Sequence, residues 1–276
     1  MPGNYDNTAD VNPVSYDPSS GWWYTSYTNG LSSSDKFGIA GDVAVPADYD
    51  FDGIVDRAVF RDGWWYTSYS QSGSSPVKWG VSGDVPVPAD YNNDGHVDRA
   101  VYRQGWWYVS GEANPRKWGV SGDEPYPGHY DSDGILDLAI YRPSTGYWIA
   151  SKSASGAVVN VKCGVPTRVP ADRPVPRDYD GDGLTDPCVF VAALSKWVYV
   201  SSSSGYTAYG SFYSGTGGLT DVPVIADYDK DGTLDPGVIN GSAMGAWHID
   251  LSTGSQMPDS RVGILIDARG VPLGSR

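Results

Sequence analysis

The chain has 276 residues and a formal net charge of −14, which disfavours a nucleic-acid partner because such a protein needs a basic face. Its 35 glycines and 20 prolines, with 31 tryptophans and tyrosines against 5 phenylalanines, are typical of short strands joined by many turns. No apolar segment approaches the roughly 20 residues of a transmembrane helix, and none shows the periodicity of an amphipathic helix. We therefore expect an all-β protein without a membrane span.

A nine-residue segment with the pattern Asp-x-Asp-x-Asp-Gly-x-x-Asp recurs along the chain. Copies start near residues 48, 90, 129, 178 and 227, and a degenerate copy starts near residue 4. The starts lie 39 to 49 residues apart, and one more period follows the last copy. A repeat of about 40 to 50 residues is typical of a four-stranded propeller blade. The sequence therefore predicts one domain over residues 1–276, a closed β-propeller of about six four-stranded blades.

The strands are easiest to locate in the unit around residue 90, where we predict them at residues 85–89, 98–102, 106–110 and 116–120. The third strand of every unit carries a tryptophan that we assign to the core between blades: Trp23, Trp65, Trp107, Trp148, Trp197 and Trp247. Residues 270–273 match the first strand of a unit, and residues 2–5 match the segment just after that strand. We expect the two ends to complete the same blade, which would leave the ring without an open edge.

The repeated segment has the composition of a calcium loop. Positions 1, 3, 5 and 9 carry carboxylates, and four carboxylates this close repel one another strongly without a cation between them. Ca²⁺ takes six to eight oxygen ligands, and the backbone carbonyl of position 7 would add to the set. The Gly at position 6 permits the sharp turn around an ion. An EF-hand is excluded because the loop ends on Asp at position 9 between β-rich flanks.

These loops, with a Pro-rich strand before and an apolar strand after each, resemble FG-GAP (VCBS) repeats, the integrin α-subunit type of propeller, over essentially the whole chain. The resemblance implies that each loop joins the first two strands of a blade and binds a structural calcium ion. His129 departs from the pattern at position 1, which predicts a weaker site, and the degenerate loop at residues 4–12 is expected to hold calcium poorly or not at all. The implied ligands, with position 7 contributing its carbonyl, are Asp48, Asp50, Asp52, Ile54 and Asp56; Asp90, Asn92, Asp94, His96 and Asp98; Asp131, Asp133, Ile135 and Asp137; Asp178, Asp180, Asp182, Leu184 and Asp186; and Asp227, Asp229, Asp231, Thr233 and Asp235.

Three consecutive units begin the third strand with two tryptophans. The first of each pair, Trp22, Trp64 or Trp106, should point to the opposite face from the second, because side chains alternate along a strand. Arg61 and Arg103 lie in the short turns just before. Indole faces and guanidinium forks suit sugar rings and carboxylates, so these five residues define a hypothetical carbohydrate site between adjacent blades. The alternative is that both indoles pack between blades, with the arginines stacked on them.

We interpret the chain as an extracellular, calcium-stabilised binding module that is lectin-like and monomeric. A protein-interaction or adhesion domain is the first alternative, and a polysaccharide lyase or hydrolase on the same scaffold is another, because a fold does not decide function. No catalytic motif is present, so the sequence leaves enzymatic activity open. Weak calcium sites fill at the millimolar levels found outside cells, which favours secretion, and we expect that any leader has been removed. Cys163 and Cys188 are compatible with one disulfide or with two buried thiols.

Overall fold

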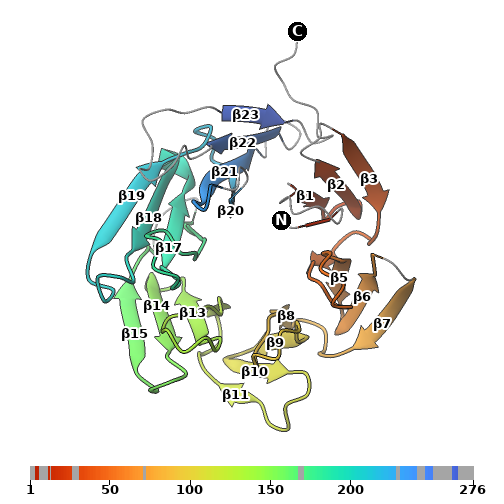
Figure 1. Ribbon diagram of the computed structural model, residues 1–276, viewed down its shortest axis with the longest axis horizontal. Coiled ribbons are helices and arrows are strands. Elements are labelled where there is room, and N and C mark those ends of the chain that lie inside the picture. The colour runs from red at the N-terminus through yellow and green to blue at the C-terminus, as the bar shows by residue number, and fades with distance from the viewer. Residues whose placement is uncertain are drawn as a thin grey trace.

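The protein is an all-β propeller of six antiparallel sheets. The computed structural model describes residues 4–5, 12, 14–26, 31–70, 73–166, 171–227, 231–240, 246–250 and 263–266. Within these residues, regular structure consists of β-strands and one short 3-10 helix, η1 (Ala192–Leu194). The six sheets stand around a common centre, as Figure 1 shows. The predicted fold class is therefore confirmed.

We number the sheets as blades 1 to 6 in chain order. Blade 1 has three described strands, β1 (Val14–Asp17), β2 (Trp22–Ser26) and β3 (Ser32–Lys36). The other five blades each have four. They are β4 (Val43–Ala44), β5 (Arg57–Arg61), β6 (Trp64–Ser68) and β7 (Ser74–Lys78); β8 (Val85–Pro86), β9 (Ala100–Arg103), β10 (Trp106–Val109) and β11 (Arg116–Lys117); β12 (Glu124–Pro125), β13 (Leu138–Arg142), β14 (Tyr147–Ser151) and β15 (Val158–Lys162); β16 (Arg173–Pro174), β17 (Cys188–Val191), β18 (Lys196–Val200) and β19 (Tyr209–Tyr213); and β20 (Val222–Ala226), β21 (Asp235–Asn240), β22 (Ala246–Asp250) and β23 (Gly263–Ile266).

Within each blade the strands follow one another from the centre of the ring to its rim, for example β13, β14 and β15 in Figure 1. The acidic loop joins the first and second strands, and a tight turn joins the second and third. Because consecutive strands are antiparallel, these two connections lie at opposite ends of the blade. The acidic loops therefore share one face of the ring, which we call the loop face. The tight turns and the doubled tryptophans share the other, which we call the tryptophan face.

The four strands predicted around residue 90 are present, but the first and last are shorter than predicted. The innermost strand β8 ends at Pro86, and an isolated bridge between Ala89 and Asp98 continues its pairing up to the acidic loop. The outermost strand β11 ends at Lys117 because Gly119, at φ +114°, turns the chain toward the next blade. The predicted pattern of strands is therefore correct, whereas its boundaries move by a few residues.

The core lies between neighbouring blades and is built on the second tryptophan of each unit. The described members are at most 1% exposed, as predicted: Trp23, Trp65, Trp107, Trp148 and Trp197. The indole of Trp65 also donates to the carbonyl of Trp79 at 2.8 Å, and Trp79 in turn donates to Tyr108 of the next blade at 3.1 Å. Trp23, Trp107 and Trp197 likewise donate to backbone carbonyls, whereas Trp148 Nε1 has no hydrogen-bond partner among the described residues. The side chain of Trp247 lies outside the described residues.

Two expectations concern the chain ends and the cysteines. Residues 270–273, which we expect to complete blade 1, lie outside the described residues. At the other end, the amide of Val55 donates to the carbonyl of Asn4 at 2.7 Å, so blade 1 contacts the loop of blade 2. Cys163 and Cys188 are both buried and free, which selects two thiols over a disulfide. The thiol of Cys163 donates to the carbonyl of Val198 at 3.3 Å, so it links blades 4 and 5 as Trp79 links blades 2 and 3.

Candidate functional site

The five acidic loops share one backbone design. The carboxylate at position 5 accepts the amide of position 7 in every loop, as in Asp52 with Ile54 at 2.8 Å. Where position 1 is Asp, it accepts the amide of the glycine at position 6, as in Asp48 with Gly53 at 2.9 Å. The position-6 glycines all have φ near +80°, a conformation that side chains disfavour: Gly53, Gly95, Gly134, Gly183 and Gly232. The loops therefore fold alike, as five equivalent copies of one site should.

The carboxylate at position 9 fastens each loop to the blade. Asp186 is fully buried and accepts the amides of Tyr179 at 2.7 Å and of Ser202 at 2.6 Å. Ser202 lies in the turn between the third and fourth strands, and its hydroxyl also donates to Asp182 at 2.9 Å. Ser70 and Ser153 contact the loops of blades 2 and 4 in the same way. These serines were not predicted from the sequence, although one stands 14 or 16 residues after position 9 in each of these three loops.

The carboxylates at position 3 meet the physical requirement for a bound cation. One oxygen each of Asp50, Asp131 and Asp180 is buried and has no hydrogen-bond partner among the described residues. In blades 2 and 5, carboxylate oxygens of positions 1, 3 and 9 lie within 4.8 Å of one another. Burial, with a smaller contribution from neighbouring carboxylates, raises the pKa of Asp50, and burial raises that of Asp186 to about 6. A divalent cation would supply the missing partner and offset these charges.

Two of the five loops depart from the full pattern, and a third is described only in part. In blade 3, Asn92 supplies an amide at position 3, and the His96 side chain packs on Phe51 of the neighbouring loop with ring centroids 3.7 Å apart. In blade 4, His129 Nδ1 lies 3.3 Å from the carbonyl of Ile135, which is the position-7 oxygen that a calcium ion would use. In blade 6, Asp229 lies outside the described residues. Blades 2 and 5 therefore carry the most complete candidate metal sites that the structure describes.

On the tryptophan face, the first tryptophan of each pair points away from the core as predicted. Trp64 and Trp106 are each 40% exposed, and Trp22 is partly buried. A lysine of the outermost strand covers each exposed indole: Lys78 Nζ lies 5.3 Å from the Trp64 ring centroid, and Lys117 Nζ lies 5.1 Å from that of Trp106. These are cation–π contacts that leave the ammonium groups at the surface. Aromatic faces and hydrogen-bond donors are thus presented together.

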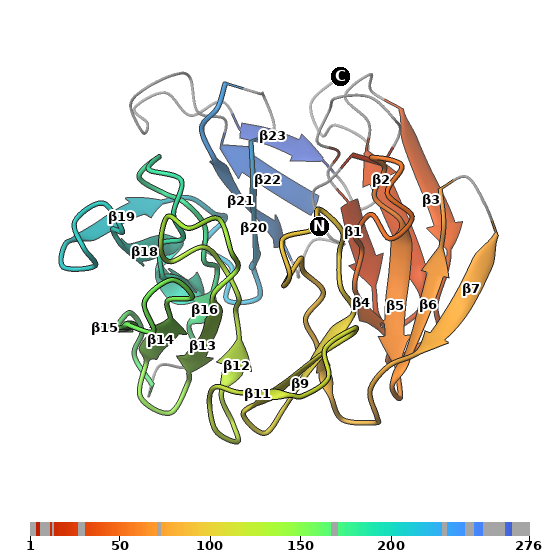
Figure 2. The ribbon, with the colours of Figure 1, turned by 60° about the horizontal axis from the view of Figure 1, so that its bottom comes forward.

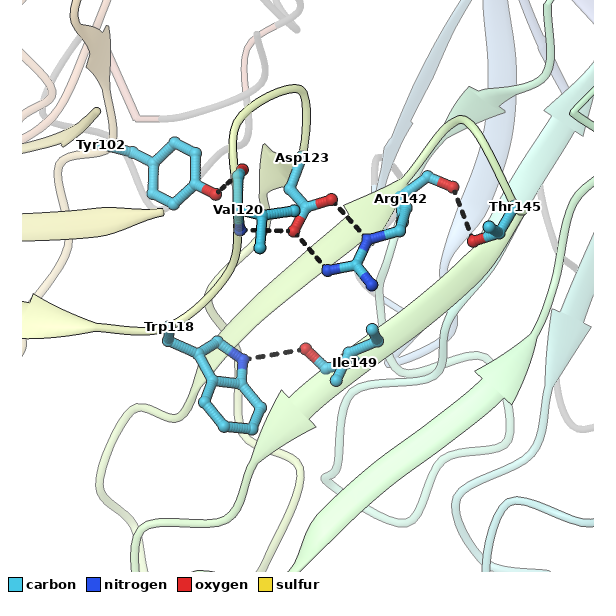
Figure 3. Close-up of polar contacts among 7 residues, drawn as sticks. All are labelled: Tyr102, Trp118, Val120, Asp123, Arg142, Thr145 and Ile149. Atoms are coloured by element: carbon cyan, nitrogen blue, oxygen red, sulfur yellow. Dashed lines mark hydrogen bonds and ion pairs between the residues drawn. The ribbon is translucent and has the colours of Figure 1, made fainter. Parts of the chain in front are cut away.

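The arginines beside these tryptophans are bound within the protein. Arg61 Nε and Nη2 donate to Asp42 at 2.5 and 2.8 Å, and Arg103 forms the same fork with Asp84. Blade 4 repeats it with Arg142 and Asp123, as Figure 3 shows. The three buried aspartates each follow a glycine at the turn into blade 2, 3 or 4, a Gly-Asp signal visible in the sequence. Two nitrogens of each guanidinium therefore already donate to a buried aspartate. These arginines contribute to the structure of this face and do not present a free pair of donors to a ligand.

The tryptophan face has a cavity at one junction between neighbouring blades. Between blades 3 and 4, a cavity of about 200 Å³ is lined by Trp118, Val120, Ile140, Arg142 and Ile149. Trp118 donates to the carbonyl of Ile149 at 3.1 Å across this cavity (Figure 3). In blades 2 and 3, a tyrosine occupies the position of Ile149 and lies under the arginine, for example Tyr108 with its ring centroid 4.6 Å from Arg103 Cζ. The cavity between blades 3 and 4 is thus lined by isoleucine, which is smaller than the tyrosine at the same position of blades 2 and 3.

Neither a family model nor a curated protein matches the chain by sequence. Solved structures match its fold. A lectin of Agrocybe aegerita, described as recognising non-reducing terminal N-acetylglucosamine, is 13% identical, with a TM-score of 0.59 over 99% of this chain and 83% of the lectin. Virginiamycin B lyase from Staphylococcus aureus is 10% identical, with a TM-score of 0.52 over 98% and 88% of the two chains. A dihydro-heme d1 dehydrogenase is 10% identical, with a TM-score of 0.51 over 95% of this chain and 65% of the dehydrogenase.

These likenesses place the chain among the β-propellers. The three neighbours are a lectin, a lyase and a dehydrogenase, so the shared fold does not select one activity. Because no family model matches the chain, the resemblance of the loops to FG-GAP repeats is supported only by the residues of the loops. No helix in the described part of the chain is long and apolar enough to cross a membrane.

Proposed function

We propose that this propeller is an extracellular carbohydrate-binding module, stabilised by calcium on its loop face and binding glycans on its tryptophan face. The observation that carries the proposal is the recurrence of an exposed aromatic ring at one position in consecutive blades: Trp64, Trp106 and, in blade 4, Tyr147, which is 37% exposed. An aromatic ring held in place by strand pairing offers a flat apolar face to a sugar ring without a large entropic cost.

The surroundings of these rings support glycans as the ligand. The lysines over Trp64 and Trp106 supply donors for sugar hydroxyls and for acidic groups. Exposed aliphatic side chains lie at the equivalent turns, including Val81 and Val120. Similar sites in neighbouring blades suit weak binding at each one, with avidity for a multivalent glycan. The similarity in fold to a lectin agrees with this proposal.

The proposed calcium ions stabilise the ring. Their ligands would be the carboxylates at positions 1, 3, 5 and 9 with the carbonyl at position 7, most completely in the loops of blades 2 and 5. The loops also contact one another across blade boundaries, as between Phe51 and His96, so an ordered loop supports its neighbour. Sites of this type with dissociation constants of roughly 10⁻⁴ to 10⁻³ M are filled outside cells, which is why we propose that location.

A glycan array probed with and without calcium tests the proposal. We expect selective binding by the wild-type protein and its loss in the double variant Trp64→Ala/Trp106→Ala. Replacing a central tryptophan of a binding site commonly costs about 2 kcal/mol, or roughly 30-fold in affinity per site. The melting temperature of this variant should stay within a few degrees of the wild-type value because both indoles are exposed.

The matched control is Trp65→Ala, which changes the neighbouring buried indole and should cost about 3–5 kcal/mol of stability. If the double variant binds glycans as well as the wild type does, the aromatic positions are not the binding site. If the folded wild-type protein binds no glycan, the proposed function is wrong and the adhesion alternative replaces it.

A further inference from the structure

The first residues of the innermost strands, on the tryptophan face, break the symmetry of the repeat. Each innermost strand begins directly after a buried aspartate, and its first residue lies beside the axis of the ring. In blades 2, 3 and 6 this residue is an exposed valine: Val43, Val85 and Val222. Blade 4 has Glu124 in its place and blade 5 has Arg173. Two adjacent blades thus replace an apolar residue by an acid and a base.

The two charged residues line one cavity. It has a volume of about 560 Å³ and lies between β12, β16 and β20, the innermost strands of three adjacent blades, which Figure 2 shows on one side of the ring's centre. Glu124 and Tyr126 line it from blade 4, Asp172 and Arg173 from blade 5, and Val222 and Pro223 from blade 6. Two walls of the cavity therefore carry charged residues and the third is apolar. Its volume falls within the range of small-molecule sites in proteins.

Glu124 and Arg173 do not neutralise each other. No ion pair joins Glu124 to Arg173 in the described structure, and no hydrogen bond of the Arg173 guanidinium to a described residue is found. Glu124 accepts one hydrogen bond, from the Tyr126 hydroxyl at 3.3 Å. Partial burial raises the pKa of the Glu124 carboxyl, although the residue as a whole is exposed. By contrast, Arg61, Arg103 and Arg142 on the same face each form a fork with a buried aspartate.

We propose that this cavity binds a small zwitterion of the amino acid or short-peptide class. The carboxylate of the ligand pairs with the planar fork of Arg173, which suits two parallel hydrogen bonds. The ammonium group of the ligand pairs with Glu124, and an apolar side chain packs against Val222 and Pro223. One ligand therefore supplies the partner that each charged wall lacks. This site is separate from the exposed aromatic rings of the tryptophan face and goes beyond the proposed glycan binding.

Isothermal titration of the folded protein with L-leucine and L-leucyl-L-leucine tests the proposal. The single-charge analogues 4-methylpentanoate and isoamylamine are titrated in parallel. We expect saturable binding of at least one zwitterion and roughly 10- to 100-fold weaker binding of both analogues, because each lacks one charge-assisted contact. Binding of neither zwitterion at about 10 mM, or equal binding of an analogue, overturns the proposal.

Two variants locate the site and preserve the fold. Glu124→Val and Arg173→Val each install the residue that blades 2, 3 and 6 already carry at this position, so we expect unchanged melting temperatures. Each should weaken zwitterion binding roughly 10-fold or more and leave glycan binding unchanged. The variant Trp64→Ala/Trp106→Ala should show the reverse pattern, so failure of this site is distinguishable from failure of the proposed function. Unchanged zwitterion binding in both valine variants refutes the site.

Discussion

Replacing Asp50 by alanine separates the structural role of a loop from its proposed role in binding calcium. One oxygen of Asp50 is buried without a partner among the described residues, and burial together with the charges of Asp52 and Asp48 raises the pKa of its carboxyl. Without calcium, this carboxylate costs free energy in the folded protein. We therefore expect Asp50→Ala to be at least as stable as the wild type in EDTA. In calcium, the order should reverse.

The size of the calcium effect can be worked out from mass action. An ion at about 100 times its dissociation constant stabilises the folded state by about 2.7 kcal/mol per site, which corresponds to about 10 mM calcium for a site of 10⁻⁴ M. Two complete loops, those of blades 2 and 5, then contribute about 5 kcal/mol, or about 10 °C in melting temperature for a chain of this size. Asp50→Ala should remove about half of this increase and lower the calcium stoichiometry by one.

Thermal unfolding in EDTA and in calcium, combined with calorimetric titration, measures both quantities. Asp35→Ala is the control, since it removes a carboxylate that is 56% exposed, is paired with Arg57 and is not one of the proposed calcium ligands. It should leave the increase in melting temperature and the stoichiometry unchanged. The reasoning is refuted if calcium does not stabilise the wild type, or if both variants respond to calcium as the wild type does.

Three further predictions concern stability. Arg142→Met leaves the carboxylate of Asp123 buried and unpaired and should cost about 3 kcal/mol in denaturant unfolding; adding Asp123→Asn should recover part of it, and an additive loss would contradict the pairing. Cys163 and Cys188 should not react with a thiol reagent until the protein unfolds, because burial raises the pKa of Cys163 to about 12 and that of Cys188 well above its usual value; rapid reaction in the native state would contradict their burial. Trp118→Phe removes one hydrogen bond between blades and should cost about 1 kcal/mol, whereas a change below a few tenths would show that water replaces the bond.

Much of the fold could be predicted because the repeat displays it directly. The loop spacing sets the number of blades, and the strand alternation correctly separated exposed Trp64 from buried Trp65. The ends of the strands could not be predicted as well. They depend on where a glycine such as Gly119 takes a positive φ and releases the chain from the sheet, which tertiary packing decides.

The polar partners of the candidate sites were harder to predict than the sites themselves. Arg61 was assigned to ligand binding because it precedes Trp64, but its fork is bound to Asp42, 19 residues earlier in the chain. Only the register that pairs β4 with β5 brings these two residues together. The Gly-Asp pair that recurs before the innermost strands of blades 2, 3 and 4 was the available signal. Glu124 and Arg173 likewise stand out only when they are aligned with the valines at the same position of blades 2, 3 and 6.

Strand length sets the distance between the two faces of the ring. The second and third strands of a blade are four to six residues long, so about 13–20 Å separates the acidic loop from the exposed tryptophan of the same blade. A metal ion in the loop cannot coordinate a sugar hydroxyl over that span. Chelation would therefore act on recognition only by loosening the scaffold, and a glycan would leave as the blades separate. A propeller held together by other means would keep its sugar specificity in the absence of any metal.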